Sequence, residues 1–211
     1  TTILPRLAHQ YNVGIEHNAD QVDFNYETKL CGFIKGYSRR FYQHSIDHRG
    51  TPETPGRVVT LVKTDDHDSA VWGVAYKIKP EDIECVTNHL DYREKNGYTK
   101  KKIFFFPQDT NVEPFELTLY VATEENESYA GDVSFTQCDI AKQIVHCRGP
   151  SGPNKEYVYN LAAAMRNLAP QVNDTHLFAL EKAVRIIICY KVGRGSWDLV
   201  CYNYYNITLY K

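Results

Sequence analysis

The sequence lacks any apolar run long enough to cross a membrane. A membrane-spanning helix needs about 20 mostly apolar residues, and the stretch "IICYKV" near the C-terminal end is far too short. The N-terminal region also lacks a basic segment followed by an apolar run, which is the pattern of a secretory signal peptide. We therefore expect neither a signal peptide nor a membrane partner.

A large excess of either charge is also missing. The 24 Lys and Arg residues are balanced by 26 Asp and Glu residues, which gives a formal net charge of −2. Proteins that bind nucleic acid generally present a strongly basic face, so we expect no nucleic-acid partner. Lys100, Lys101 and Lys102 form the only basic run, which we interpret as the charged start of a strand.

Closely spaced cysteines are absent as well. The six cysteines are scattered and include no C-x-x-C pair, which argues against a structural zinc site and against a disulfide-dense scaffold. We expect buried free thiols in a reducing, cytoplasmic compartment. Three triplets of the N-glycosylation type, which begin at Asn126, Asn173 and Asn206, leave a secretory route open.

The common signatures of cofactor-dependent and hydrolytic enzymes do not occur. The sequence has no P-loop, no G-x-G-x-x-G after a strand and no G-x-S-x-G elbow. His44 and His48 are four residues apart with Asp47 between them, but they fall where a strand runs into a loop. Side chains four apart share a face on a helix and not there. We therefore expect no metal site and no cofactor.

Hydrophobic periodicity predicts several strands before the first helix. Apolar and polar residues alternate from Leu30 to Ser45, as in a half-buried strand. The runs "RVVTLV" and "AVWGVAYKI" are rich in β-branched and aromatic residues, and we expect them to form a hairpin with a long turn. A helix is predicted over "KPEDIECVTNHLDYREK", and two further strands over "KKIFFFP" and "FELTLYVAT".

Three more helices are predicted in the second half of the chain. Ser134 and Gln137 have the spacing of a capping box at the start of the first. Apolar residues at helical spacing from Tyr157 to Leu168 mark the second, and the third begins near Asp174. Short connections between the early strands are unlike a doubly wound sheet. We therefore expect one α+β domain over residues 1–211, with helices outside a small, mixed, strongly curved or closed sheet.

One carboxylate lies between the first helix and the strand that follows it: Glu94, in "YREKNGY". A helix end that leads into a buried strand places its last side chains at the rim of a sheet, where pockets form. A glutamate drawn from water there has its pKa raised above about 4.3 and can exchange protons near neutrality. Glutamates at helix ends more often only pair with a nearby Arg or Lys, so the residues alone leave both roles open.

Several long segments, in this order, resemble one enzyme family: "GYSRRFYQHSIDHRGTPETPGRVVTLV", "VWGVAYKI", "YREKNGY", "FFFPQD", "CRGPSGPNKEYVYNLAAAMRNL" and "HLFALEKAV". They are similar to the ChaC family of glutathione-specific γ-glutamylcyclotransferases. The similarity runs from about Val22 to Arg185, whereas residues 1–21 and 186–211 diverge. The resemblance implies a γ-glutamylcyclotransferase-like fold, in which helices flank a small β-barrel.

The resemblance also implies a reaction. In this family the α-amine of the γ-glutamyl group of glutathione attacks the γ-carbonyl of the same molecule, which releases 5-oxoproline and cysteinylglycine. The family's acid/base glutamate is matched by Glu94. A single carboxylate suits this chemistry, because it can take a proton from the amine and return it to the departing nitrogen.

The resemblance further suggests substrate-binding residues. Tyr157 matches a family tyrosine beside the substrate, although packing in the core is an equal alternative. Arg49, in "DHRG", either orders its loop or faces the cavity, and we favour ordering. The family's Tyr-Gly-Ser-Leu-type loop, which holds the γ-glutamyl carboxylate, corresponds to Ile15, Glu16, His17 and Asn18 after Gly14. The loop signature is absent there, and Glu16 adds a negative charge.

Two hypotheses follow. The first is a glutathione-cleaving lyase with Glu94 as acid/base, in which activity is weakened by the altered loop. The second is a catalytically silent protein of the same fold that binds a ligand or partner. The retained glutamate favours the first and the missing loop signature favours the second. For the assembly we expect a monomer or a weak homodimer.

Overall fold

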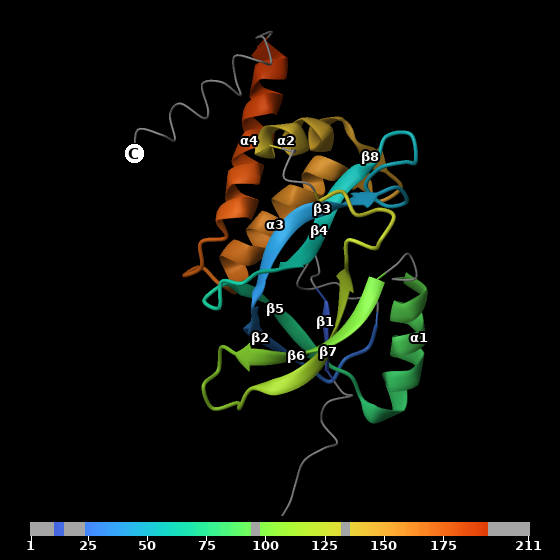
Figure 1. The fold of residues 1–211 in the computed structure, drawn as a ribbon, viewed down its shortest axis with the longest axis vertical. Coiled ribbons are helices and arrows are strands. Elements are labelled where there is room, and N and C mark those ends of the chain that lie inside the picture. Colours follow the sequence, from blue (N-terminus) through green and yellow to red (C-terminus); the bar gives the residue numbers. More distant parts are fainter. Residues whose placement is uncertain (1–10, 15–23, 94–97, 132–135, 194–211) are drawn as a thin grey trace, which may run out of the picture. The chain divides into compact units, whose positions relative to one another are not determined.

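The computed structural model of the 211-residue chain describes residues 11–14, 24–93, 98–131 and 136–193. The helices are a short 3₁₀ helix (Pro80–Asp82), α1 (Ile83–Arg93), α2 (Gln137–His146), α3 (Asn154–Leu168) and α4 (Thr175–Gly193). The strands are β1 (Tyr11–Gly14), β2 (Thr28–Lys35), β3 (Tyr37–Ser45), β4 (Gly56–Lys63), β5 (Ala70–Lys77), β6 (Tyr98–Pro107), β7 (Phe115–Ala122), β8 (Arg148–Gly149) and β9 (Gly152–Pro153). Figure 1 labels these elements on the ribbon.

The chain divides into two compact units, and each is built from separate segments. The barrel unit comprises Thr1–Arg40, Thr60–Tyr129 and Ala163–Val172. The helical unit comprises Phe41–Val59, Ala130–Ala162 and Asn173–Lys211. The boundaries fall inside β3, β4 and α3, so these three elements contribute residues to both units.

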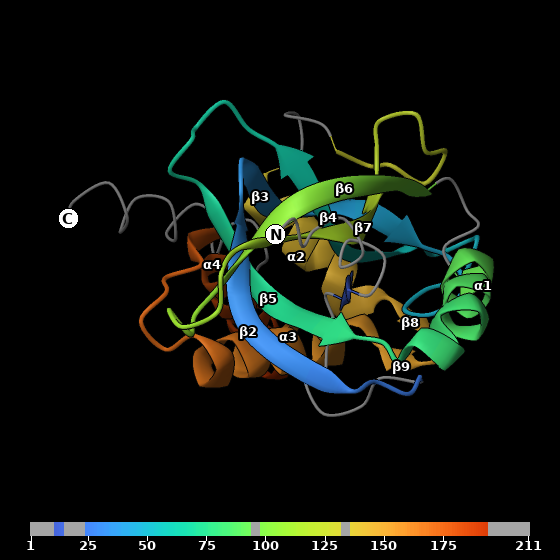
Figure 2. The ribbon, with the colours of Figure 1, turned by 90° about the horizontal axis from the view of Figure 1, so that it is seen from below.

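Five strands of the barrel unit close into a ring in the order β1-β5-β2-β6-β7 (Figure 2). β1 pairs antiparallel with β5 and parallel with β7, so the barrel is mixed. β6 and β7 form the antiparallel hairpin that "KKIFFFP" and "FELTLYVAT" predict. Full closure leaves no open edge on this sheet, which explains how a barrel this small avoids edge-to-edge association.

Alternation along the strands gives the barrel two apolar faces. Inside, a buried cluster contains Ile34, Leu61, Val71, Ala75, Phe105, Leu117, Leu119 and Val121. Outside, Val74 and Tyr76 of β5 pack with Val86 and Leu90 of α1, which lies beside the barrel (Figures 1 and 2). Because successive strand residues point to opposite faces, β5 contributes residues both to the barrel interior and to the outer surface against which α1 packs.

The helical unit contains α2, α4 and the first part of α3. Its most buried residues repeat at helical spacing, as Ile140 and Ile144 do on α2 and as Leu177, Leu180 and Val184 do on α4. α2 and α4 pack against each other. A capping box formed by Thr136 and Asp139 begins α2, and the Asp174 carboxylate accepts a hydrogen bond from Leu177 N–H at the start of α4.

The structure corrects two predictions about local structure. "RVVTLV" and "AVWGVAYKI" do not pair as a hairpin, because β4 pairs with β3 and β5 pairs with β1 and β2. The described cap of α2 is Thr136 with Asp139 and not Ser134 with Gln137. Within the divergent residues 1–21, for which no element was predicted, Tyr11–Gly14 forms a barrel strand. Four residues are too few for an alternating pattern to be recognised.

Only some of the cysteines are the buried free thiols that we expected. Cys147 is buried and free, and Cys31 is free and half-buried. Cys85 and Cys189 are free but exposed, and Cys138 takes part in a disulfide. In the part of the chain that the structure describes, no helix is both long and apolar enough to span a membrane. The α+β class with a small mixed barrel is confirmed.

Candidate active site

Several residues predicted from the resemblance lie outside the described part of the chain. They are Glu94 and the loop residues Ile15, Glu16, His17 and Asn18. Gly14 is the last residue of β1, where it pairs with Val74 of β5. α1 ends at Arg93 and β6 begins at Tyr98. The site can therefore be described only through Arg49, Tyr157 and their surroundings, which all belong to the helical unit.

The Arg49 loop, residues 46–55 between β3 and β4, docks onto the β8–β9 hairpin. Ser151 N–H donates to the His48 carbonyl at 2.9 Å. A Cβ atom on Gly149 would overlap the same carbonyl oxygen, so only glycine allows the two backbones to come this close. The glycine-rich turn that the sequence shows between α2 and α3 therefore fixes the position of the Arg49 loop.

Arg49 is held at both its backbone and its side chain. Its N–H donates to Ser45 Oγ at 2.9 Å, and Nη1 donates weakly to the Pro153 carbonyl at 3.4 Å. The guanidinium lies over the Tyr157 ring, 5.8 Å from its centroid, which is a cation–π distance. The side chain is half-buried. These contacts order the loop, and they also place a cation beside Tyr157.

Tyr157 is buried, with 1 % of its surface exposed. Its hydroxyl accepts a hydrogen bond from Val59 N–H at 3.0 Å. Its ring meets Phe41 edge to face, with the centroids 5.9 Å apart. Tyr157 therefore packs in the core of the helical unit, and the same contacts give its ring a fixed position below Arg49.

Asn154, which sequence reasoning did not single out, joins α3 to β4. It is fully buried; Oδ1 accepts from Arg57 N–H at 2.7 Å and Nδ2 donates to the Arg57 carbonyl at 2.8 Å. Its own N–H donates to the Cys147 carbonyl at 3.0 Å. The asparagine follows the "GPSGP" turn directly, which is the only sequence signal that could have drawn attention to it.

Arg57 is a second residue that the sequence did not reveal. Only 1 % of its surface is exposed, and its guanidinium donates to Gln143 Oε1 at 2.7 Å and to the Ala130 carbonyl at 2.9 Å. Burial of the guanidinium lowers the pKa of Arg57 from its usual value. In "GRVVTLV" this arginine looks like an ordinary residue at the start of a strand, because its burial depends on α2 and on residue 130.

Two titratable groups near Arg57 have shifted pKa values. The pKa of His44 is lowered, first by burial and then by the positive charge of Arg57. Burial raises the pKa of the Cys147 thiol, although Arg57 acts in the opposite direction. The Cys147 thiol donates to the Pro55 carbonyl at 3.1 Å. Both groups therefore favour their neutral forms in the folded protein.

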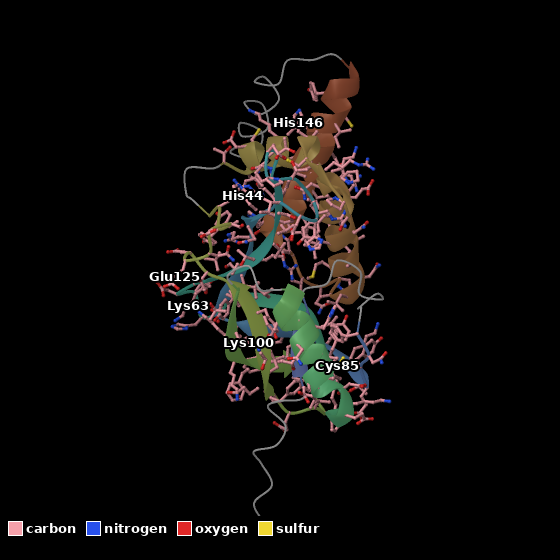
Figure 3. All side chains as sticks on the ribbon, turned by 90° about the vertical axis from the view of Figure 1, so that its right-hand side faces the viewer. His44, Lys63, Cys85, Lys100, Glu125 and His146 are labelled. Atoms are coloured by element: carbon pink, nitrogen blue, oxygen red, sulfur yellow. The ribbon has the colours of Figure 1, made fainter. Side chains whose placement is uncertain are left out.

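His44 and His48 are in different surroundings. His44 is half-buried, whereas His48 is exposed, lies 3.8 Å from the Asp47 carboxylate and contacts Ser151 Oγ at 3.4 Å. Figure 3 shows His44 and His146 within the helical unit. Among the residues that the structure describes, no three His, Cys, Asp or Glu side chains gather as a metal ion would require.

The described residues thus provide the half-buried guanidinium of Arg49 next to the buried phenol ring of Tyr157. A guanidinium in partly desolvated surroundings attracts carboxylates more strongly than one in water does. The chemistry of this arrangement suits an anion.

Comparison with known proteins identifies the family. The ChaC-like protein family matches residues 19–187, nearly the range over which the motifs resemble it. The chain is 44% identical over 164 residues to glutathione-specific gamma-glutamylcyclotransferase 1 of Rattus norvegicus, covering 77% of this chain and 72% of the rat protein. It is 35% identical over 174 residues to the glutathione-specific gamma-glutamylcyclotransferase of Schizosaccharomyces pombe, covering 76% and 85%.

A solved structure supports the same assignment. The crystal structure of the yeast gamma-glutamylcyclotransferase specific to glutathione has a TM-score of 0.75 to this chain at 27% identity, covering 83% of this chain and 95% of the yeast chain. The predicted γ-glutamylcyclotransferase-like fold is therefore confirmed. The chain belongs to the ChaC-like family.

Proposed function

We propose that the chain is a glutathione-specific γ-glutamylcyclotransferase that cleaves glutathione to 5-oxoproline and cysteinylglycine. The observation that carries the proposal is the 44% identity over 77% of the chain to a relative named for this activity. The segments that carry the resemblance include "YREKNGY", with its central glutamate, and "GPSGPNKEY", with its tyrosine.

We assign the acid/base step to Glu94. Its carboxylate takes a proton from the substrate ammonium, and the freed amine attacks the γ-carbonyl carbon. A C–N bond forms in the five-membered ring, the bond to the cysteine nitrogen breaks, and the Glu94 carboxylic acid returns the proton to that nitrogen. A second proton passes from the ring nitrogen to the cysteine nitrogen by the same route, which leaves the lactam N–H and the cysteinyl ammonium. The atoms of glutathione are divided between the two products, so the reaction consumes no water and needs no cofactor.

The protein's main task in such a reaction is to hold the substrate bent. Nucleophile and electrophile belong to one molecule, and orientation of this kind can contribute up to about 7–11 kcal/mol. We assign binding of the γ-glutamyl carboxylate to residues 14–18, and contacts with the rest of the substrate to Arg49 and Tyr157. The fixed positions of these last two support their role in orienting the substrate.

The test is to incubate the protein with glutathione and measure 5-oxoproline. Glu94→Gln should abolish its formation, because glutamine is nearly isosteric but cannot accept and return a proton. Glu84→Gln is the matched control, since Glu84 is an exposed glutamate of α1, and it should keep full activity. Unchanged turnover in Glu94→Gln would assign the reaction to another group.

A catalytically silent ligand-binding protein is the second candidate. The observation that favours it is the missing Tyr-Gly-Ser-Leu-type signature at Ile15, Glu16, His17 and Asn18. The two candidates differ in one measurement: the silent protein would bind glutathione in calorimetry but form no 5-oxoproline.

A further inference from the structure

The Arg49 guanidinium has more hydrogen-bonding capacity than its described neighbours use. A guanidinium has five N–H donors, and one of them meets the Pro153 carbonyl at 3.4 Å. The Tyr157 ring holds the group in place but offers no oxygen acceptor. None of the carboxylates in the described residues comes within ion-pair distance of Arg49. A half-buried cation of this kind is suited to a carboxylate ligand.

Gly152 lies beside the Arg49 guanidinium. This residue has a φ of +101°, and a Cβ on it would lie 3.4 Å from Arg49 Nη1 and 3.3 Å from Glu156 Oε2. A side chain at this position would contact the guanidinium directly. Glu156 is exposed, so water and salt screen its repulsion of a bound anion.

The chemistry of glutathione offers one group for this position. The γ-glutamyl end is common to all γ-glutamyl compounds, so it cannot distinguish glutathione from the others. The cysteinylglycine end can, and its only group that is ionised near neutrality is the glycine carboxylate, because a thiol has a pKa of about 8.5. A protein that prefers glutathione therefore gains most from a cation at the glycine end.

We propose that Arg49 binds the glycine carboxylate of glutathione and thereby selects glutathione among γ-glutamyl compounds. The inference rests on the proposed function and adds the part of the substrate that Arg49 recognises. It adds to the interpretation of Arg49 as a loop-ordering residue: the Ser45 contact orders the loop through the backbone, and the guanidinium donors that do not meet Pro153 are left for the substrate.

The experiment compares two substrates in two proteins. Glutathione and its glycinamide analogue, in which a neutral amide replaces the terminal carboxylate, are given to the unaltered chain and to Arg49→Gln, and kcat/KM for 5-oxoproline formation is measured. The unaltered chain should prefer glutathione by about 10- to 100-fold, the range for a charge-assisted hydrogen bond. Arg49→Gln should lose this preference, because its kcat/KM should fall about 10- to 100-fold more on glutathione than on the amide.

Two further variants make the result specific. Arg148→Gln removes an exposed arginine from the neighbouring strand β8, and it should keep the preference for glutathione. Arg49→Lys keeps the charge but loses the planar fork, so its preference should fall without vanishing. It also serves as the test if Arg49→Gln does not fold.

An equal loss of kcat/KM on both substrates in Arg49→Gln would overturn the proposal, because it would show a role in the loop or at the γ-glutamyl end. If the unaltered chain forms no 5-oxoproline, the proposed function fails, and the same comparison is made with calorimetric binding. Tighter binding of glutathione than of its amide, lost in Arg49→Gln, would still support the role of Arg49. Equal binding, or none, would exclude it.

Discussion

Asn154 and Tyr157 lie one turn apart on α3 and bind the backbone of β4 two residues apart. Asn154 bonds to both backbone groups of Arg57, and the Tyr157 hydroxyl accepts from Val59 N–H. N–H groups two residues apart on a strand point to the same side. Two side chains of a helix thus take the place that a neighbouring strand would have, and they fix the first turn of α3 to β4.

Asn154→Ala should lower the free energy of unfolding by about 2–5 kcal/mol, because it leaves two buried backbone groups of Arg57 without these partners, at about 1–3 kcal/mol each. Urea unfolding measures the loss. Asn160→Ala, at an exposed position of the same helix, should change stability by less than about 0.5 kcal/mol. Similar losses in the two variants would contradict the importance of the Arg57 contacts.

Tyr157→Phe keeps the ring below Arg49 and removes only the hydroxyl that accepts from Val59 N–H. We expect a loss of about 1–3 kcal/mol in the free energy of unfolding. Tyr159→Phe is the control, since Tyr159 is half-buried on the same helix with its ring under Arg185. Thermal unfolding of the two variants should differ clearly, and an unchanged Tm for Tyr157→Phe would rule out a stabilising hydrogen bond.

His44 should make stability depend on pH. Its pKa in the folded protein is lowered by burial and by Arg57, so the unfolded chain takes up a proton first as the pH falls below about 6.5. The free energy of unfolding should therefore decrease from that pH down to the folded-state pKa. His44→Gln should reduce this decrease, measured by urea unfolding at about pH 7.5 and about pH 5.5. His67→Gln removes an exposed histidine and should leave the decrease unchanged.

Residues with strong local patterns were predicted well from the sequence. The helix predicted from near Asp174 is α4, and the runs "KKIFFFP" and "FELTLYVAT" identified β6 and β7. The pairing of β4 with β3 was not predicted, because strand partners depend on contacts between distant segments. For the same reason no local pattern indicates that Arg57 is buried, whereas Arg49 and Tyr157 were identified as site residues through the family resemblance alone.

Gly152→Ala should lower both stability and glutathione turnover. A residue with a side chain is strained by about 1–2 kcal/mol at a positive φ, and the new methyl group would lie 3.4 Å from Arg49 Nη1 and 3.3 Å from Glu156 Oε2. Gly36→Ala separates the two effects, because Gly36 has a φ of +75° but nothing within 4 Å of its Cβ position. It should lose stability and keep its KM for glutathione. A matching rise of KM in both variants would argue against crowding at Arg49.

Replacing Ile15, Glu16, His17 and Asn18 by Tyr-Gly-Ser-Leu should raise the affinity for glutathione. Backbone N–H groups converge on a carboxylate when glycine permits the turn, and removal of Glu16 ends a like-charge repulsion of about 1 kcal/mol at a water-exposed separation. KM for glutathione measures the effect. If the unaltered chain already turns over glutathione briskly and the graft changes nothing, the carboxylate is bound elsewhere.

The division of both units among separate segments has a consequence for synthesis on the ribosome. The barrel unit needs residues up to Val172, and α4 of the helical unit extends to Gly193. Domains made of contiguous chain can fold one after the other as they emerge. Here neither unit can be completed until most of the chain has been translated. Early strands such as β2, which pairs with β5 and β6, therefore have no partners until those later strands have been made.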